Sequence, residues 1–180
     1  MNSTIVDLNK ILDSKSLNNE LDFERASIID RKLRVLIKDY PELTEKRQKL
    51  RAILHDYENR VWVEMPITKE KIHESDLAEA VAEQERLFLH NRRELIRKRL
   101  QAYSLTQKDL GKILGHASVS YISELVNGIS PFTIHDLFVI HLLLKIEFKD
   151  LIPTMLNLDE RSKITEIVNQ LSNTKLRSIN

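Results

Sequence analysis

The chain has 180 residues, of which 42% are hydrophobic and 31% charged, a profile typical of a globular protein rich in helices. Three glycines and four prolines are too few for a large sheet with many tight turns, and the absence of cysteine excludes disulfides, thiol catalysis and thiolate zinc sites. No apolar run reaches the roughly 20 residues of a membrane helix, and residues 1–4 do not resemble a signal peptide. We therefore expect a soluble, cytoplasmic protein.

The net charge of +1 is unevenly distributed along the chain. Residues 1–85 carry 14 basic and 18 acidic side chains, whereas residues 86–115 carry eight basic and two acidic ones. A basic block inside an otherwise neutral chain predicts a surface that binds a polyanion. The alternative is a basic helix face that only contacts solvent.

The first segment, residues 1–22, is polar but places Ile5, Leu8 and Leu12 at helical spacing. We expect either a short helix or a segment that is disordered when free. The segment from Phe23 to Trp62 has two amphipathic stripes separated by Pro41, the pattern of a helical hairpin.

The stretch Val61–Ile67 breaks this helical pattern. It alternates, is β-branched and contains Pro66, so it predicts an extended connector or a short edge strand. Ser75 is a candidate cap for a following helix, which either runs to about Tyr103 or breaks near residues 90–91. Residues 23–85 together predict a helical region for dimerisation or partner binding.

Two short helices are predicted between Leu105 and Gly128. Ser104 or Thr106 can cap the first, and Leu110, Ile113 and Leu114 would form its apolar face. Gly111 suits a close approach of two helices, and Gly115 a left-handed residue that ends the first helix. The second helix begins near Ser118 and ends at Asn127-Gly128, and its inward residues would be Ile122, Leu125 and Val126. This is the plan of a helix-turn-helix, whose second helix enters the major groove of DNA.

The segment resembles the Cro/C1-type, or XRE, family of helix-turn-helix regulators. The matching residues are Leu105-Thr106-Gln107-x-x-Leu110-Gly111-x-x-Leu114-Gly115 and Ser118-x-Ser120-x-Ile122-Ser123-x-Leu125-x-Asn127-Gly128, followed by Pro131 to Leu137, Leu142 to Ile146 and Asp150 to Pro153. The resemblance implies an all-α fold with a five-helix DNA-binding domain over residues 86–153. The spacing from Gly115 to Gly128 is about one residue longer than in the common form, so the turn is expected to be longer.

The second helix lacks lysine and arginine and carries Glu124, which departs from an ordinary DNA-reading helix. Phosphate contacts are therefore expected from the neighbouring helices. The candidates are Arg92, Arg93, Arg97, Lys98, Lys108 and Lys112, with Thr106 and Gln107 at the helix start and His116 in the turn. Base contacts are expected from Ser118, Ser120, Tyr121, Ser123 and Asn127.

The N-terminal half is similar to HigA-type antitoxins, through a helical hairpin that ends in Leu50-x-x-Ile53-Leu54-His55-Asp56-Tyr57-Glu58 and a proline-containing connector. This resemblance implies a homodimer that represses its own operon and neutralises an RNA-cleaving toxin, with residues 1–22 or the hairpin as the toxin-binding surface. In the simpler interpretation, the hairpin is only a dimerisation element.

Residues 154–180 predict a C-terminal helix with the stripe Ile164, Ile167, Val168 and Leu171, and then a frayed tail. The six histidines do not form a metal-binding pattern, and no phosphate loop or nucleophile elbow is present. We expect no enzyme activity, no metal and no cofactor. The alternatives to the antitoxin are a stand-alone XRE repressor and an interaction scaffold that has lost DNA binding.

Overall fold

The protein is all-helical across the residues that the computed structural model describes, 7–153 and 158–171, which confirms the expected fold class. In chain order the helices are α1 (Leu8–Ser14), α2 (Glu20–Leu36), α3 (Leu43–Glu58), α4 (Lys69–Ala102), α5 (Gln107–Ile113), α6 (Val119–Asn127), α7 (Ile134–Leu144), α8 (Phe148–Leu151) and α9 (Leu158–Gln170). The π-helical turn η1 (Asn59–Val63) continues α3. The predicted features within residues 1–6, 154–157 and 172–180, the frayed tail included, lie outside the described residues.

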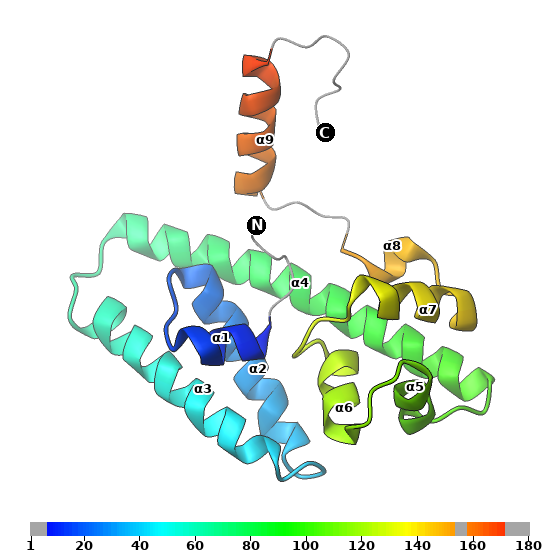
Figure 1. The fold of residues 1–180 in the computed structure, drawn as a ribbon. Coiled ribbons are helices and arrows are strands. Elements are labelled where there is room, and N and C mark those ends of the chain that lie inside the picture. The colour runs from blue at the N-terminus through cyan, green and yellow to red at the C-terminus, as the bar shows by residue number, and fades with distance from the viewer. Residues whose placement is uncertain (1–6, 154–157, 172–180) are drawn as a thin grey trace.

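Helix α4 is the element around which the other helices are arranged (Figure 1). It runs for 34 residues without a break at residues 90–91, so the continuous alternative is correct. Helices α1–α3 lie along its N-terminal half and α5–α8 along its C-terminal half. The predicted boundary between residues 85 and 86 therefore falls inside one helix, and the two halves of the molecule share it.

The start of α4 differs from the prediction. Thr68 is the N-cap, since its side chain accepts a hydrogen bond from the Lys71 amide, and the helix begins at Lys69. Ser75, the predicted cap, lies inside the helix and donates to the Glu20 carboxylate of α2. The cap was misplaced because Thr68 offers the same chemistry two turns earlier.

The predicted extended connector over Val61–Ile67 is wrong for its first part. Residues 61–63 belong to η1, in which the Glu64 amide donates to the Asn59 carbonyl at 2.9 Å. Lys71 lies over the Trp62 ring, 4.6 Å from its centroid, and donates to the Val61 carbonyl. These contacts with α4 override the β-propensity of the β-branched residues.

The N-terminal half has its own apolar core, called here the hairpin core. Its fully or nearly buried members come from α1, α2, α3 and two loops: Leu8, Leu17, Ala26, Ile29, Leu33, Leu43, Leu50, Ile53, Tyr57 and Ile129. The predicted short helix thus exists as α1 and is packed rather than free, since Leu8 is fully buried. Ile129 is the exception in sequence, because it follows α6.

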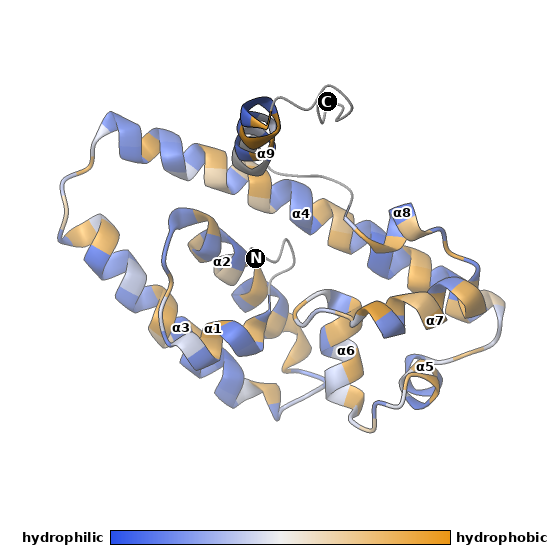
Figure 2. Cartoon of the chain, turned by 45° about the horizontal axis from the view of Figure 1, so that its top comes forward, coloured by the Kyte–Doolittle hydropathy of each residue, from blue (hydrophilic) through white to orange (hydrophobic). Residues whose placement is uncertain are grey.

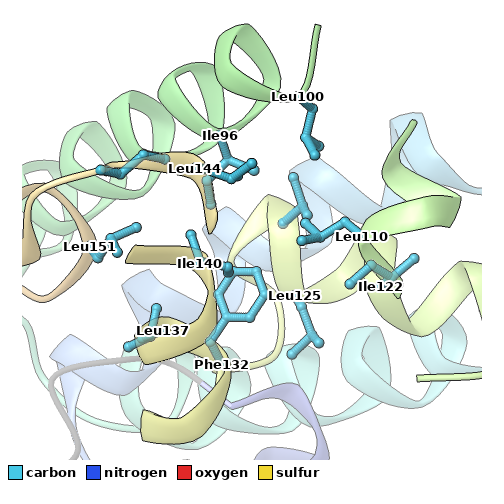
Figure 3. Close-up of a cluster of buried hydrophobic side chains, with 12 residues drawn as sticks. Ile96, Leu100, Leu110, Ile122, Leu125, Phe132, Leu137, Ile140, Leu144 and Leu151 are labelled. Carbon is cyan, nitrogen blue, oxygen red and sulfur yellow. The ribbon is translucent and has the colours of Figure 1, made fainter. Parts of the chain in front are cut away.

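The C-terminal half has a second core, called here the C-terminal core, which Figure 3 shows in close-up. Its buried members come from α4 and from the segment between α5 and α8: Ile96, Leu100, Leu110, Ile122, Leu125, Val126, Phe132, Leu137, Ile140, Leu144, Ile146 and Leu151. Ile122, Leu125 and Val126 point inward as predicted. Ile113 does not, because 45% of its surface is exposed.

Helix α9 follows α8 after a segment outside the described ranges and stands apart from the other helices in Figure 1. Ile167 and Leu171 of its predicted stripe are exposed. In the part of the chain that the structure describes, no helix is both long and apolar enough to cross a membrane.

Candidate nucleic-acid interface

Helix α5 begins with a complete capping box. The Thr106 hydroxyl accepts from the Asp109 amide, and the Asp109 carboxylate accepts from the Thr106 amide. These hydrogen bonds lower the pKa of Asp109, the Thr106 side-chain bond being the largest cause. Of the two predicted caps, Thr106 is correct and Ser104 is not. The capping fixes where α5 starts and leaves Lys108 and Lys112 exposed on its surface.

Two glycines bring α5 and α6 together. A Cβ at Gly111 would lie 3.3 Å from the His116 carbonyl and 3.6 Å from Ile122, so the close approach of the two helices requires this residue. Gly115 has a φ of +78°, the left-handed conformation that ends a helix. Both sequence predictions are confirmed by this geometry.

Helix α6 is capped at both ends. The Ser118 hydroxyl accepts from the Tyr121 amide at the start, and Gly128 adopts a φ of +68° at the end. A Cβ at Gly128 would lie only 2.9 Å from a methyl carbon of Leu89, so α4 fixes this end of the helix. The caps make α6 a short, rigid rod held between α5 and α4.

A hollow of about 330 Å³ opens where α5 meets the start of α6. Lys108, Lys112, His116 and Ser118 line it, so the structure brings together four of the predicted contact residues. His116 is anchored there, since its Nε2 lies 3.1 Å from an oxygen of the buried Asp136 carboxylate and its ring packs edge-on against Tyr121. The hollow combines two flexible cations with an exposed hydroxyl at a helix start, a combination suited to phosphate.

Residues 96–151 match the family model described as Helix-turn-helix. This segment is a helix-turn-helix domain. The match covers just under a third of the chain and supports a DNA-binding transcription regulator of the XRE type. No curated protein and no solved structure matches the chain significantly.

Arg92 does not serve as the predicted phosphate contact of the helix-turn-helix domain. It is 1% exposed and donates from Nη1 to the Leu151 carbonyl at 3.2 Å, while its guanidinium packs against the rings of Phe88 and Phe132. Burial lowers its pKa to about 10. The reason is position: Arg92 falls on the face of α4 that also carries the buried Leu89 and Ile96. It ties α4 to the end of α8 instead.

The other basic residues of α4 lie near the surface but do not line the hollow. Arg97 and Lys98 are exposed, and Arg93 is half-buried. Arg93 and Arg97 each lie within 4 Å of Glu94, at 3.8 and 3.9 Å. Such exposed pairs are weak and leave both arginines available to another anion.

The predicted base-reading set divides along the length of α6. Ser118 is exposed and Ser120 and Tyr121 are partly exposed, at the first turn. Ser123 is only 2% exposed, and Asn127 is half-buried with its side-chain amide donating to the Ser123 carbonyl. The expectation that Ser123 faces DNA is wrong for this arrangement, because its side chain is buried. Its neighbour Glu124, on the outer face of α6, is covered by another part of the chain.

The covering element is the hairpin α2–α3. Lys46 of α3 pairs with the Glu124 carboxylate at 2.7 Å, and Lys32 of α2 donates to the Asn127 carbonyl at 2.9 Å. Glu124 is 1% exposed and also accepts from the Ser130 hydroxyl. Beyond α6, the Leu8 amide of α1 donates to the Ile129 carbonyl at 3.1 Å.

Lys32 and Lys46 are the residues in contact with α6 that the sequence analysis missed. The signal that could have found them is a second basic block, since residues 31–51 contain eight basic and three acidic side chains. Averaging the charge over residues 1–85 hid this block. Burial, followed by the positive charges of Arg92, Arg86 and Arg93, lowers the pKa of Lys32 to about 8.

Proposed function

We propose that the chain is a sequence-specific, DNA-binding transcriptional repressor that recognises its operator through the helix-turn-helix domain. The observation that carries the proposal is the hollow at the α5–α6 junction, where Lys108 and Lys112 flank the exposed Ser118. Two cations and a helix start in one depression suit a backbone phosphate, which positions a protein on duplex DNA.

Base recognition is assigned to the exposed first turn of α6. The Ser118 and Ser120 hydroxyls can donate to or accept from any base edge, and the exposed Val119 suits the methyl group of thymine. Gln107, Arg93, Arg97 and Lys98 would add sequence-independent contacts around it. Discrimination by this turn alone would be modest, because hydroxyls make no bidentate contact with a base.

The test begins with a random duplex library, from which rounds of binding to the full chain yield one selected duplex. Its affinity is then measured by fluorescence anisotropy against salt concentration. Lys112→Ala should weaken binding to all duplexes alike and reduce the slope of log affinity against log salt by about 0.9. Lys69→Ala, at an exposed lysine in the first turn of α4 and away from both the hollow and α7–α8, is the matched control and should leave the slope unchanged. Failure to enrich any duplex, together with salt-independent binding, would contradict the proposal and favour an interaction scaffold.

A homodimer is part of the proposal, with the outer face of α7 and α8 as its interface. Ile134 is 84% exposed, and Phe138, Leu142, Phe148 and Ile152 are also exposed. Figure 2 shows that α7 is hydrophobic along most of its length, whereas an ordinary surface helix has a polar outer face. A two-fold dimer buries one such patch against its copy. Phe138→Glu should give a monomer by light scattering, and a dimer that persists would move the interface elsewhere.

We infer that the repressor is the antitoxin of a type II toxin–antitoxin pair, with the hairpin region as the toxin-binding surface. Two carboxylates at the surface support this assignment: Glu79 is exposed and Glu24 is half-buried, and burial followed by the charges of Glu79 and the buried Glu20 raises the pKa of Glu24. Such an acidic surface suits a basic, RNA-cleaving partner. Co-expression with the product of the adjacent gene should give a stable complex that loses ribonuclease activity. A stand-alone repressor would leave that product uncomplexed and active.

A further inference from the structure

The outer face of α6 has two parts with different surroundings. Its first turn is open at Ser118 and Val119, whereas Ser123 and Glu124, one turn later, are at most 2% exposed. A recognition helix lies in a major groove about 12 Å wide, with its N-terminal residues on the base edges and the rest of its outer face along the groove. With α3 packed on Glu124, only the beginning of α6 can approach a base.

The loop that follows α6 is covered as well. Ile129 is fully buried in the hairpin core, and its carbonyl accepts from the Leu8 amide of α1. Ser130 is 1% exposed and donates to Glu124. The hairpin region therefore covers two successive parts of the helix-turn-helix domain: the second half of α6 and the loop that follows it.

The contacts that hold this cover to α6 itself are polar, whereas Ile129 in the loop after α6 is held by apolar packing in the hairpin core. Lys46, itself 34% exposed, reaches the buried Glu124 carboxylate from the rim, and Lys32 reaches a carbonyl at the end of α6. A buried ion pair is often no more stable than apolar packing of the same volume, because both charges lose their hydration. An interface closed by one ion pair and one ammonium–carbonyl hydrogen bond can separate, since water solvates the freed Glu124 carboxylate and the two freed lysines can pair with phosphates.

We propose that the α1–α3 hairpin is an autoinhibitory cover of the second half of α6, and that full DNA binding requires the turn between α2 and α3 to swing away from Glu124, whereas the closed form reads DNA through the first turn of α6 alone. The inference rests on the proposed DNA-binding function and adds its regulation. Residues 64–68 connect the hairpin to α4, and the exposed Met65 and Ile67 indicate little packing there. The corner of the hairpin is the turn between α2 and α3, residues 37–42, and its base is the opposite end, where α2 begins and α3 ends. Arg25 of α2 pairs with Glu85 of α4 at 2.5 Å and fixes the base, so the motion is assigned to the corner.

In the alternative interpretation, the basic residues at the corner of the hairpin bind DNA directly. Residues 31–51 have an excess of basic side chains, and these would strengthen DNA binding directly if the closed arrangement were the one that binds. The two interpretations predict opposite signs for the loss of one positive charge at Lys46. Under autoinhibition, the apparent affinity equals the affinity of the open form multiplied by the fraction of molecules that are open. A variant that increases this fraction therefore binds DNA more tightly.

The experiment compares the affinity of the selected duplex for full-chain variants and follows amide hydrogen exchange of α6. Lys46→Glu places a carboxylate beside Glu124 and should bind DNA roughly tenfold or more tightly than the unmodified chain. The exchange of the Ser123–Asn127 amides should become faster in the absence of DNA. Lys46→Met, which keeps the stem of the side chain, should act in the same direction to a smaller extent and guards against a folding defect.

Lys49→Glu is the matched control, because it makes the same charge change one turn along α3 at a residue that is 63% exposed and paired only with the exposed Glu45. It should leave α6 exchange unchanged and weaken DNA binding slightly. If Lys46→Glu and Lys49→Glu weaken binding equally, the corner binds DNA directly and the autoinhibition is wrong. If all variants bind alike, DNA binding stands and the cover has no regulatory effect. If Lys46→Glu accelerates α6 exchange but nothing binds DNA, the proposed function fails and the regulation of DNA binding fails with it.

Discussion

The two ends of α6 differ in a way that the amino-acid types do not reveal. Both carry small polar residues on the outer face, Ser118 and Ser120 at one end and Ser123 and Asn127 at the other. The first end lies at the open hollow beside Lys108 and Lys112, while the second is closed by Lys46 and Lys32 from the hairpin. Whether a polar residue reads DNA is thus decided by the tertiary surroundings, here by a segment about 80 residues away in the chain.

The largest expected effect comes from removing the support that both ends share. Leu125 is fully buried in the C-terminal core, so Leu125→Ala leaves a cavity and should lower the free energy of unfolding by roughly 3 kcal/mol. Urea denaturation measures this loss, and Leu87→Ala, at a residue that is 46% exposed, is the control with little effect. Equal losses for the two variants would mean that α6 does not rest on this core.

The stability of the folded chain should depend on pH through Lys32, which contacts the C-terminal end of α6. The pKa of Lys32 is lowered from 10.5 to about 8 in the folded chain, mainly by burial. Between these values the unfolded chain keeps a proton that the folded chain has released, so the stability contributed by Lys32 rises with pH and is smallest below about pH 8. The full rise across this window is roughly 3 kcal/mol.

Lys32→Met removes this titration and keeps the apolar stem. The difference in free energy of unfolding between the unmodified chain and Lys32→Met should therefore grow in favour of the unmodified chain as the pH increases. Urea denaturation of both proteins on the two sides of the window measures it. Parallel pH profiles would show that the pKa of Lys32 is not lowered in the folded chain and that its burial against α6 costs little free energy.

The smallest expected effect separates the two ends directly. If the hairpin leaves α6 on DNA binding, Ser123→Ala should change base preference as Ser120→Ala does, by roughly 1 kcal/mol at one position of the selected duplex. Ser162→Ala, at an exposed serine of α9, is the control. Should only Ser120→Ala alter the preference in a competition assay with base-substituted duplexes, the covered end does not reach DNA.

The parts of the fold that the sequence predicted are those with local causes. The α5–α6 unit was found because Thr106, Gly111, Gly115, Ser118 and Gly128 each impose a conformation within a few residues, and all five act as expected. The inward side chains of α6 followed from helical periodicity.

The parts that failed depend on contacts between distant segments. A charge count could not show that Arg92 lies on the buried face of α4, since the arginines next to it, including Arg93, are of the same type. The π-helical turn at 59–63 contacts Lys71 of α4, and the cover of α6 is made with Lys32 and Lys46. Periodicity identified the hairpin as helical but carried no information about which surface it would cover.

The central claim is that the hairpin corner must leave α6 before the second half of the helix can read DNA, and an intramolecular distance tests it most directly. Because the chain has no cysteine, spin labels can be placed at Lys49→Cys on α3 and His135→Cys on α7, both exposed, without other changes. The labelled chain is mixed with an excess of the unlabelled chain, so that each dimer carries labels on one chain only, and pulsed electron paramagnetic resonance then measures the label-to-label distance within that chain with and without the selected duplex. The account predicts one distance in the free protein and a longer one at saturating duplex. The same single distance in both samples, with DNA bound, would contradict it.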